Sequence, residues 1–142
     1  MSRLRKGEWL ALAGGVTLLV LLFLPWFDGR IGWTSLGWLM ILLLGLSIAG
    51  AAWIAFTTVD GVLTRIMPAL VMTTTLGAIT VLVLLLRVLA FPPGDTETAA
   101  YLGLVAMALI PTGAFVALAD ERTDAPESAY TPPAPRPAPP AT

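Results

Sequence analysis

The stretch WLALAGGVTLLVLLFLPW, from Trp9 to Trp26, contains no charged side chain, and Thr17 is its one polar residue besides the tryptophans. A helix of about 18 residues is roughly 27 Å long, close to the hydrocarbon thickness of a bilayer. No small-x-small cleavage site follows the apolar core, as a secretory signal peptide would require. The stretch therefore predicts an uncleaved membrane-spanning helix.

Three further apolar runs follow, so the sequence predicts an all-α transmembrane protein, a four-helix membrane bundle with short loops. The predicted helices cover about residues 8–25, 35–56, 66–90 and 99–119. Ser35 is the expected N-cap of the second helix, and Pro68 fits the first turn of the third. Pro111 lies within the fourth helix, where it should free the carbonyl of Met107 and produce a kink.

The composition changes abruptly after Ala119. Residues 1–119 form the predicted transmembrane domain, and residues 120–142 read as a Pro/Ala-rich tail with no apolar surface to bury. We expect this tail to be disordered and cytoplasmic. The alternative is that its proline-rich part docks in a groove lined with aromatic residues.

Composition limits the chemistry. Of 142 residues, 57% are hydrophobic and 12% are charged, which fits a chain with little surface in water. The sequence has no cysteine and no histidine, which removes disulfides, thiolate sites, the commonest metal ligand and the usual general base. We therefore expect no enzyme, no cofactor and no metal, and the net charge of −1 gives no reason to expect a nucleic-acid partner.

Basic residues near the membrane predict the orientation, because they favour the cytoplasmic side. With the N-terminus inside, six basic residues are cytoplasmic, namely Arg3, Arg5, Lys6, Arg65, Arg122 and Arg136, against Arg30 and Arg87 outside. This predicts a multi-pass protein of the cell membrane with both termini in the cytoplasm. Aromatic residues near the helix ends are the predicted interface anchors, namely Trp9, Trp26, Trp38, Trp53 and Tyr101.

Each predicted helix has one line of small or polar residues suited to close packing against a neighbour. In chain order the lines are Ala11 and Gly15; Gly45, Ala49 and Ala52; Thr73, Gly77, Thr80, Leu84 and Arg87; and Ala99, Gly103, Ala106, Ile110, Gly113 and Ala117. We expect these lines to face the interior or another protein in the membrane.

Two polar features inside or near the helices are candidates for function. Thr73, Gly77 and Thr80 would line a transport pathway on one interpretation, while on the other the hydroxyls bond back to carbonyls one turn earlier. Arg87 lies one turn from the end of its helix, where it can reach lipid phosphate or the acids of the next loop. We also expect it to pair with Asp28, which ends the first helix on the same side of the membrane.

Several short motifs together give the chain a family likeness. They are GEWLA at 7–11 with Gly14-Gly15, FLPWF at 23–27, RVLAFPPG at 87–94 and AYLGL at 100–104. The helical region, without the tail, resembles a group of small actinobacterial four-helix integral membrane proteins. The resemblance implies a topology and no activity.

These observations favour a packing, accessory or scaffolding role in the cell membrane, with lipid and either a second copy or another membrane protein as partners. The alternative is a small oligomeric transporter or channel with a pathway along the third helix. An ionisable residue at mid-membrane, which transport paths commonly contain, is missing from the predicted helices.

Overall fold

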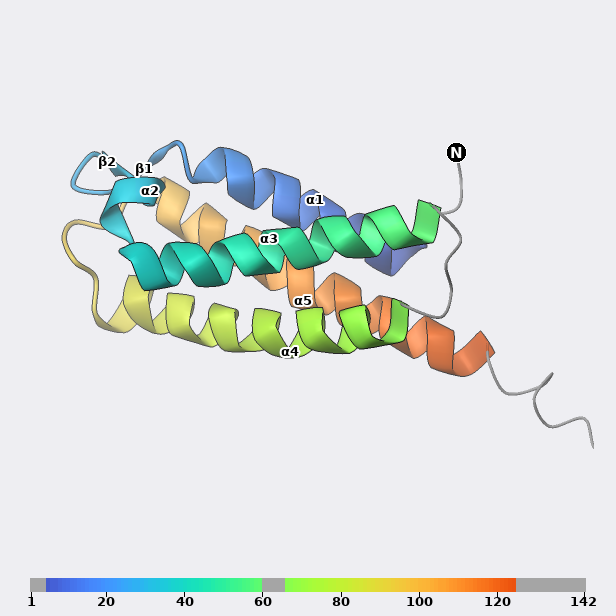
Figure 1. Ribbon diagram of the computed structural model, residues 1–142. Helices are drawn as coiled ribbons and strands as arrows, with labels where there is room; N and C mark the ends of the chain where they lie inside the picture. The colour runs from blue at the N-terminus through green and yellow to red at the C-terminus, as the bar shows by residue number, and fades with distance from the viewer. Residues whose placement is uncertain (1–4, 60–65, 125–142) are drawn as a thin grey trace, which may run out of the picture.

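Four long helices pack side by side in the computed structural model, which describes residues 5–59 and 66–124 (Figure 1). They are α1 (Lys6–Leu21), α3 (Trp38–Val59), α4 (Ile66–Leu85), continued by the π-helical turn η2 (Leu86–Ala90), and α5 (Thr98–Asp124). Strands β1 (Pro25–Phe27) and β2 (Arg30–Ile31) and the short helix α2 (Gly32–Ser35) connect α1 to α3. The segment 60–65 and the proline-rich part of the tail lie outside the described residues.

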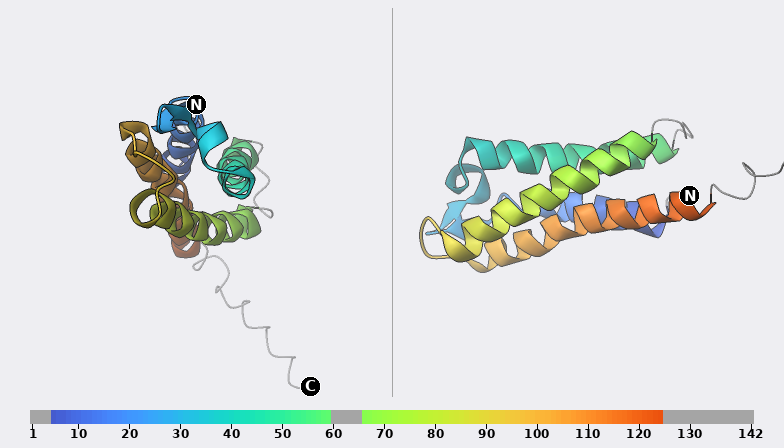
Figure 2. Two further views of the ribbon diagram at one scale, coloured as in Figure 1. Left: turned by 90° about the vertical axis from the view of Figure 1, so that its left-hand side faces the viewer. Right: turned by 90° about the horizontal axis from the view of Figure 1, so that it is seen from below.

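The helices form a square in which every neighbour runs antiparallel. α1 packs against α3 and α5, and α4 packs against the same two helices, so α1 and α4 lie diagonally opposite (Figure 2, left). We call the end where α1 begins and α5 ends the terminal end, and the end that carries β1 and β2 the hairpin end. Chain segments far apart in the sequence therefore meet at both ends.

Three of the helices are long and apolar enough to cross a membrane. The spans are Trp38–Thr57 in α3, Pro68–Ala90 in α4 with η2, and Thr98–Asp120 in α5. α1 has 16 residues and begins with Lys6-Gly7-Glu8, and it is not among these spans. The predicted membrane association is thus supported by three helices, and α1 is not one of them.

α1 ends at Leu21, four residues before the predicted end at Pro25. The N–H groups of Phe23 and Leu24 bond to carbonyls three residues earlier, which tightens the last turn. Pro25 then begins an antiparallel hairpin, which Asp28 and Gly29 close with φ values of 50° and 71°. Asp-Gly is a favoured pair in such turns because both residues tolerate positive φ. The predicted loop is therefore an ordered hairpin.

The prediction of Ser35 as an N-cap was wrong. Ser35 is the last residue of α2, and Gly37, at a φ of 79°, separates α2 from α3. The carbonyl of Gly37 accepts the N–H of Ile41, so the chain enters α3 through this glycine. A positive φ favours a residue without a Cβ, which explains why glycine stands at this break between the two helices.

The core has a large part towards the hairpin end and a smaller part that includes Ile54, Leu70 and Leu118. Trp26 belongs to the large part: it is fully buried, and its indole N–H donates to the carbonyl of Leu21 at 2.7 Å. Its ring occupies the space beside Gly103 that a Cβ would fill. The prediction of Trp26 as an interface anchor was wrong, because its amphipathic side chain satisfies its N–H inside the protein.

α1 and α5 make the most extensive helix contact, and glycine permits it. A Cβ at Gly7 would stand 2.6 Å from the carbonyl oxygen of Gly113, and one at Gly14 would stand 2.8 Å from that of Ala106. The predicted small-residue lines on these two helices are buried, from Ala11 and Gly15 to the six residues of α5. α5 also reaches five residues beyond the predicted end at Ala119.

Candidate functional site

The predicted polar line on α4 faces the interior. Thr73, Gly77, Thr80 and Leu84 are buried, and Arg87 is half-buried. The Thr80 hydroxyl donates to the Leu76 carbonyl at 2.8 Å and lies 3.4 Å from the hydroxyl of Ser47 on α3. Ser47 in turn donates to the Leu43 carbonyl at 2.9 Å. This polar contact therefore joins α3 to α4 within the core.

The same line is packed at its centre. Pro111 of α5 lies against Gly77, where an added Cβ would stand 3.0 Å from the proline Cβ. Beside this line, the Thr74 hydroxyl donates to the carbonyl of Leu70, one turn earlier, at 2.7 Å. The packing of Gly77 and Pro111 and the burial of Thr80 close the line to a continuous pathway in this conformation.

Asp28 joins two loops at the hairpin end. Its Oδ1 accepts the backbone N–H of Asp95 at 2.8 Å, and its own N–H donates to the Asp95 carbonyl at 3.1 Å. Phe27 forms a β-bridge with Thr96, and the N–H of Glu97 donates to the Trp26 carbonyl at 2.8 Å. The segment before α5 thus extends the hairpin, and no motif in the sequence indicated this pairing.

The expected ion pair between Asp28 and Arg87 is not formed. Arg87 donates through Nη1 to the carbonyl of Phe91 at 3.4 Å, within its own segment. The reason is the diagonal placement of α1 and α4, which gives the hairpin direct access to the loop after η2 but not to α4. Each residue has found a backbone partner instead.

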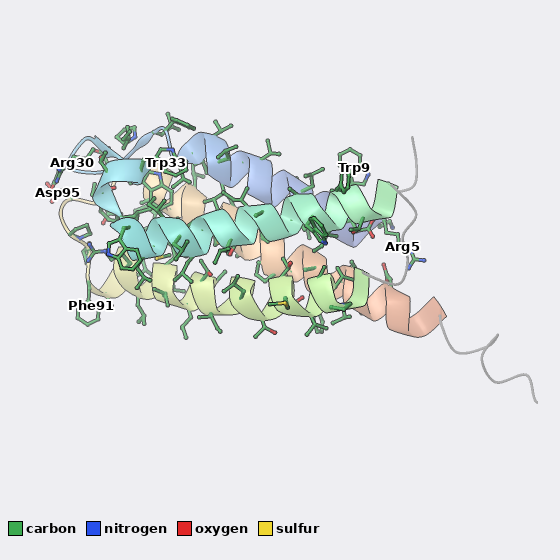
Figure 3. The ribbon with its side chains drawn as sticks, in the orientation of Figure 1. Arg5, Trp9, Arg30, Trp33, Phe91 and Asp95 are labelled. Carbon is green, nitrogen blue, oxygen red and sulfur yellow. The ribbon has the colours of Figure 1, made fainter. Side chains whose placement is uncertain are left out.

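Aromatic side chains are exposed at both ends of the bundle. Trp9 and Trp53 are exposed towards the terminal end, while Trp38 and Tyr101 are exposed towards the hairpin end. Phe23 and Trp33 add a ring contact at the hairpin end, with centroids 5.8 Å apart. Figure 3 shows Trp9 near Arg5 at one end and Trp33 near Arg30 at the other. Four of the five predicted anchors are thus exposed near an end of the bundle.

The small-residue line on α3 faces the outside of the bundle, unlike the lines on α1 and α5. Gly45, Ala49 and Ala52 are exposed, and nothing lies within 4 Å of the position that a Cβ on Gly45 would take. The buried face of α3 instead carries Met40, Leu44, Ser47, Ala51 and Ile54. We call Gly45, Ala49 and Ala52 the small face of α3. Small residues alone do not separate an inner from an outer face, because both kinds of contact use them.

Glu8 is the least exposed carboxylate among the described residues, at 3%. Its Oε2 accepts the backbone N–H of Arg5 at 2.9 Å, which caps the first turn of α1. The predicted helix begins at Glu8, but Arg5 is not one of the usual N-cap residues, so no capping-box motif indicated this contact. The contact gives Glu8 a structural role at the start of α1.

Within residues 5–59 and 66–124, no three side chains from His, Cys, Asp or Glu gather in a group able to hold a metal ion. No protein-family model, curated protein or solved structure matches the chain. The resemblance to small actinobacterial membrane proteins therefore stays a prediction.

Proposed function

We propose that this chain is a four-span protein of the cell membrane that associates with a partner through the small face of α3, in an accessory or scaffolding role. The single observation that carries the proposal is the exposure of Gly45, Ala49 and Ala52. The small residues of α1 and α5 pack against each other inside the bundle. The small face of α3 has short side chains on the outer surface, where another helix could approach closely. Helices in lipid associate by close approach at such surfaces.

α1 is the fourth proposed span. Its 16 residues rise about 24 Å, and the following Leu22-Phe23-Leu24 adds apolar length in a turn. It lies beside α3 and α5, which are two of the helices suited to crossing a membrane. A helix in that position would be surrounded by lipid and protein. A bilayer can thin locally to match a helix that is slightly too short to span it.

Disulfide crosslinking in native membranes tests the association, because the chain has no cysteine of its own. We expect Ala49→Cys to give a crosslinked dimer, or a defined larger adduct with a cysteine of one partner. The control is Val105→Cys, on the exposed face of α5, which should give neither. The double variant Gly45→Ile/Ala49→Cys should give no adduct, because the isoleucine side chain would prevent the close approach of a partner. If Ala49→Cys and Val105→Cys gave the same crosslinked products in the same amounts, the proposal would be refuted.

A transporter with a pathway along α4 is the second candidate, and the buried contact between Ser47 and Thr80 is the observation in its favour. The packing of Gly77 against Pro111 counts against it. Ion flux into liposomes that hold the purified protein distinguishes the two: the scaffolding role predicts no flux above that of empty liposomes.

A further inference from the structure

A groove of about 580 Å³ lies between α3 and α4 and opens on the outside of the bundle. We call it the α3–α4 groove, and its walls include Leu46, Gly50, Trp53, Pro68, Thr73 and Leu76. Its volume is within the range of small-molecule sites. A second groove of about 380 Å³ lies between α4 and α5, and we call it the comparison groove.

The hydroxyl of Thr73 distinguishes the α3–α4 groove. Thr73 is 5% exposed, its Oγ1 faces Gly50 of α3, and this hydroxyl makes no hydrogen bond within the described residues. In the comparison groove the hydroxyls of Thr74 and Thr112 both donate to carbonyls four residues earlier, at 2.7 Å. The Thr73 hydroxyl lines the α3–α4 groove without an acceptor from the described residues, so it is free to donate to an acceptor that enters the groove.

The length of the groove selects the kind of occupant. From Pro68 to Leu76, α4 rises about 12 Å, which is less than half of a hydrocarbon core of about 30 Å. The groove occupies the part of the Pro68–Ala90 span nearer the terminal end. A spanning helix of a partner would need a groove that continues through both leaflets, whereas one lipid chain occupies a single leaflet.

We propose that the α3–α4 groove binds an acyl chain of a membrane glycerolipid whose ester carbonyl accepts a hydrogen bond from Thr73. The residues that line the groove carry no charge, so they select for the chain and its ester rather than for a charged headgroup. Trp53 and Pro68 stand towards the terminal end of the groove, where the headgroup leaves the hydrocarbon. The proposal depends on the membrane placement of α3 and α4 and not on association through the small face.

Synthetic lipids with ester-linked and ether-linked chains test the hydrogen bond, because the ether lacks the carbonyl. The full chain in mild detergent is titrated with dioleoyl phosphatidylglycerol or its diether analogue, and bound lipid is counted by native mass spectrometry. We expect the ester lipid to bind about threefold to tenfold better, the factor that one neutral hydrogen bond supplies. Thr73→Val should remove this preference. Thr75→Val, at an exposed position of the same helix, should keep it.

A second pair of variants tests the location. Ala69→Phe fills the α3–α4 groove and should reduce binding of both lipids, whereas Ala78→Phe, which enters the comparison groove, should not. Equal binding of ester and ether lipids, or an ester preference that survives Thr73→Val, would overturn the proposal. Protein dimers without retained lipid would assign the groove to a second copy and overturn it too. Ala49 lines the groove as well as the small face, so crosslinking of Gly45→Cys, which lies outside the groove, reports separately on the small face.

Discussion

The carboxylate of Asp28 accepts a hydrogen bond from the backbone N–H of Asp95, 67 positions further along the chain. This contact holds the hairpin after α1 to the segment that leads into α5. Both residues are exposed, so the contact is made at the surface of the hairpin end. The donor is the backbone N–H of Asp95, which a substitution of Asp95 keeps. A substitution of Asp28, in contrast, can remove the acceptor.

Asp28→Ala is expected to destabilise the protein by about 2 kcal/mol. The lost hydrogen bond contributes about 1 kcal/mol, and a left-handed alanine at a φ of 50° costs about as much again. Asp28→Asn should cost much less, because asparagine keeps an acceptor oxygen and tolerates this φ. Asp95→Ala is the matched control, since it keeps the backbone donor. Unfolding titrations in detergent compare the three, and a large effect of Asp95→Ala would contradict the assignment.

Arg87→Ala and Asp28→Ala are expected to be additive. Arg87 donates to the Phe91 carbonyl and Asp28 binds Asp95, so the two side chains share no partner. The sum of the single effects should therefore match the double variant within about 0.5 kcal/mol. A coupling energy of 1 kcal/mol or more between the two substitutions would show that Asp28 and Arg87 form the ion pair predicted from the sequence.

Gly113→Ala is expected to destabilise the bundle by about 1–3 kcal/mol, the range for overpacking. Its new methyl group would meet the backbone of α1, including the carbonyl of Gly7, whose own Cβ position stands 2.6 Å from the Gly113 carbonyl. Gly45→Ala is the control, because nothing lies within 4 Å of the added methyl group and alanine favours a helix. Similar unfolding free energies for the two variants would show that α1 can move away from α5 without cost.

Trp26→Ala is expected to cost about 3–5 kcal/mol, as large-to-small changes of buried aromatic residues do. Trp38→Ala should cost little, because this side chain is 79% exposed. Trp26→Phe separates the hydrogen bond to Leu21 from the volume of the ring, and we expect an intermediate loss. Unfolding followed by circular dichroism measures all three. If Trp38→Ala proved the more damaging, the placement of the two rings would be wrong.

The orientation prediction places both termini in the cytoplasm. A reporter that is active only outside the cytoplasm should be silent when fused after Asp124 and active when fused after Gly94. The physical basis is the excess of lysine and arginine at the terminal end. The reversed pattern would overturn the assignment.

The sequence predicted the structure best where a residue type suits only one kind of environment. Long apolar runs can only be buried or lie in lipid, and all four helices were found from them. The line from Ala99 to Ala117, expected to face the interior or another protein, lies on the inner face of α5. Pro111 was recognised inside that helix, although its packing against Gly77 was not foreseen.

The sequence did not place residues that suit two kinds of environment equally well. Trp26 suits an interface and a core equally well, and the space beside Gly103, which the sequence does not reveal, decided for the core. Gly45 and Ala49 suit internal and external contacts alike, and the larger residues on the opposite face of α3 filled the interior. The pairing of Asp28 with Asp95 depends on the diagonal arrangement of the helices, which no local pattern contains.

The fit between α1 and α5 also fixes the position of the hairpin. Gly7 meets Gly113 and Gly14 meets Ala106, so contacts seven residues apart on one helix match contacts seven residues apart on the other. Sliding α1 along α5 by one turn, about 5.4 Å, would bring side chains onto these backbone contacts. The register of the two helices is therefore set near the terminal end, and it holds Trp26 level with Gly103 and Asp28 within reach of Asp95.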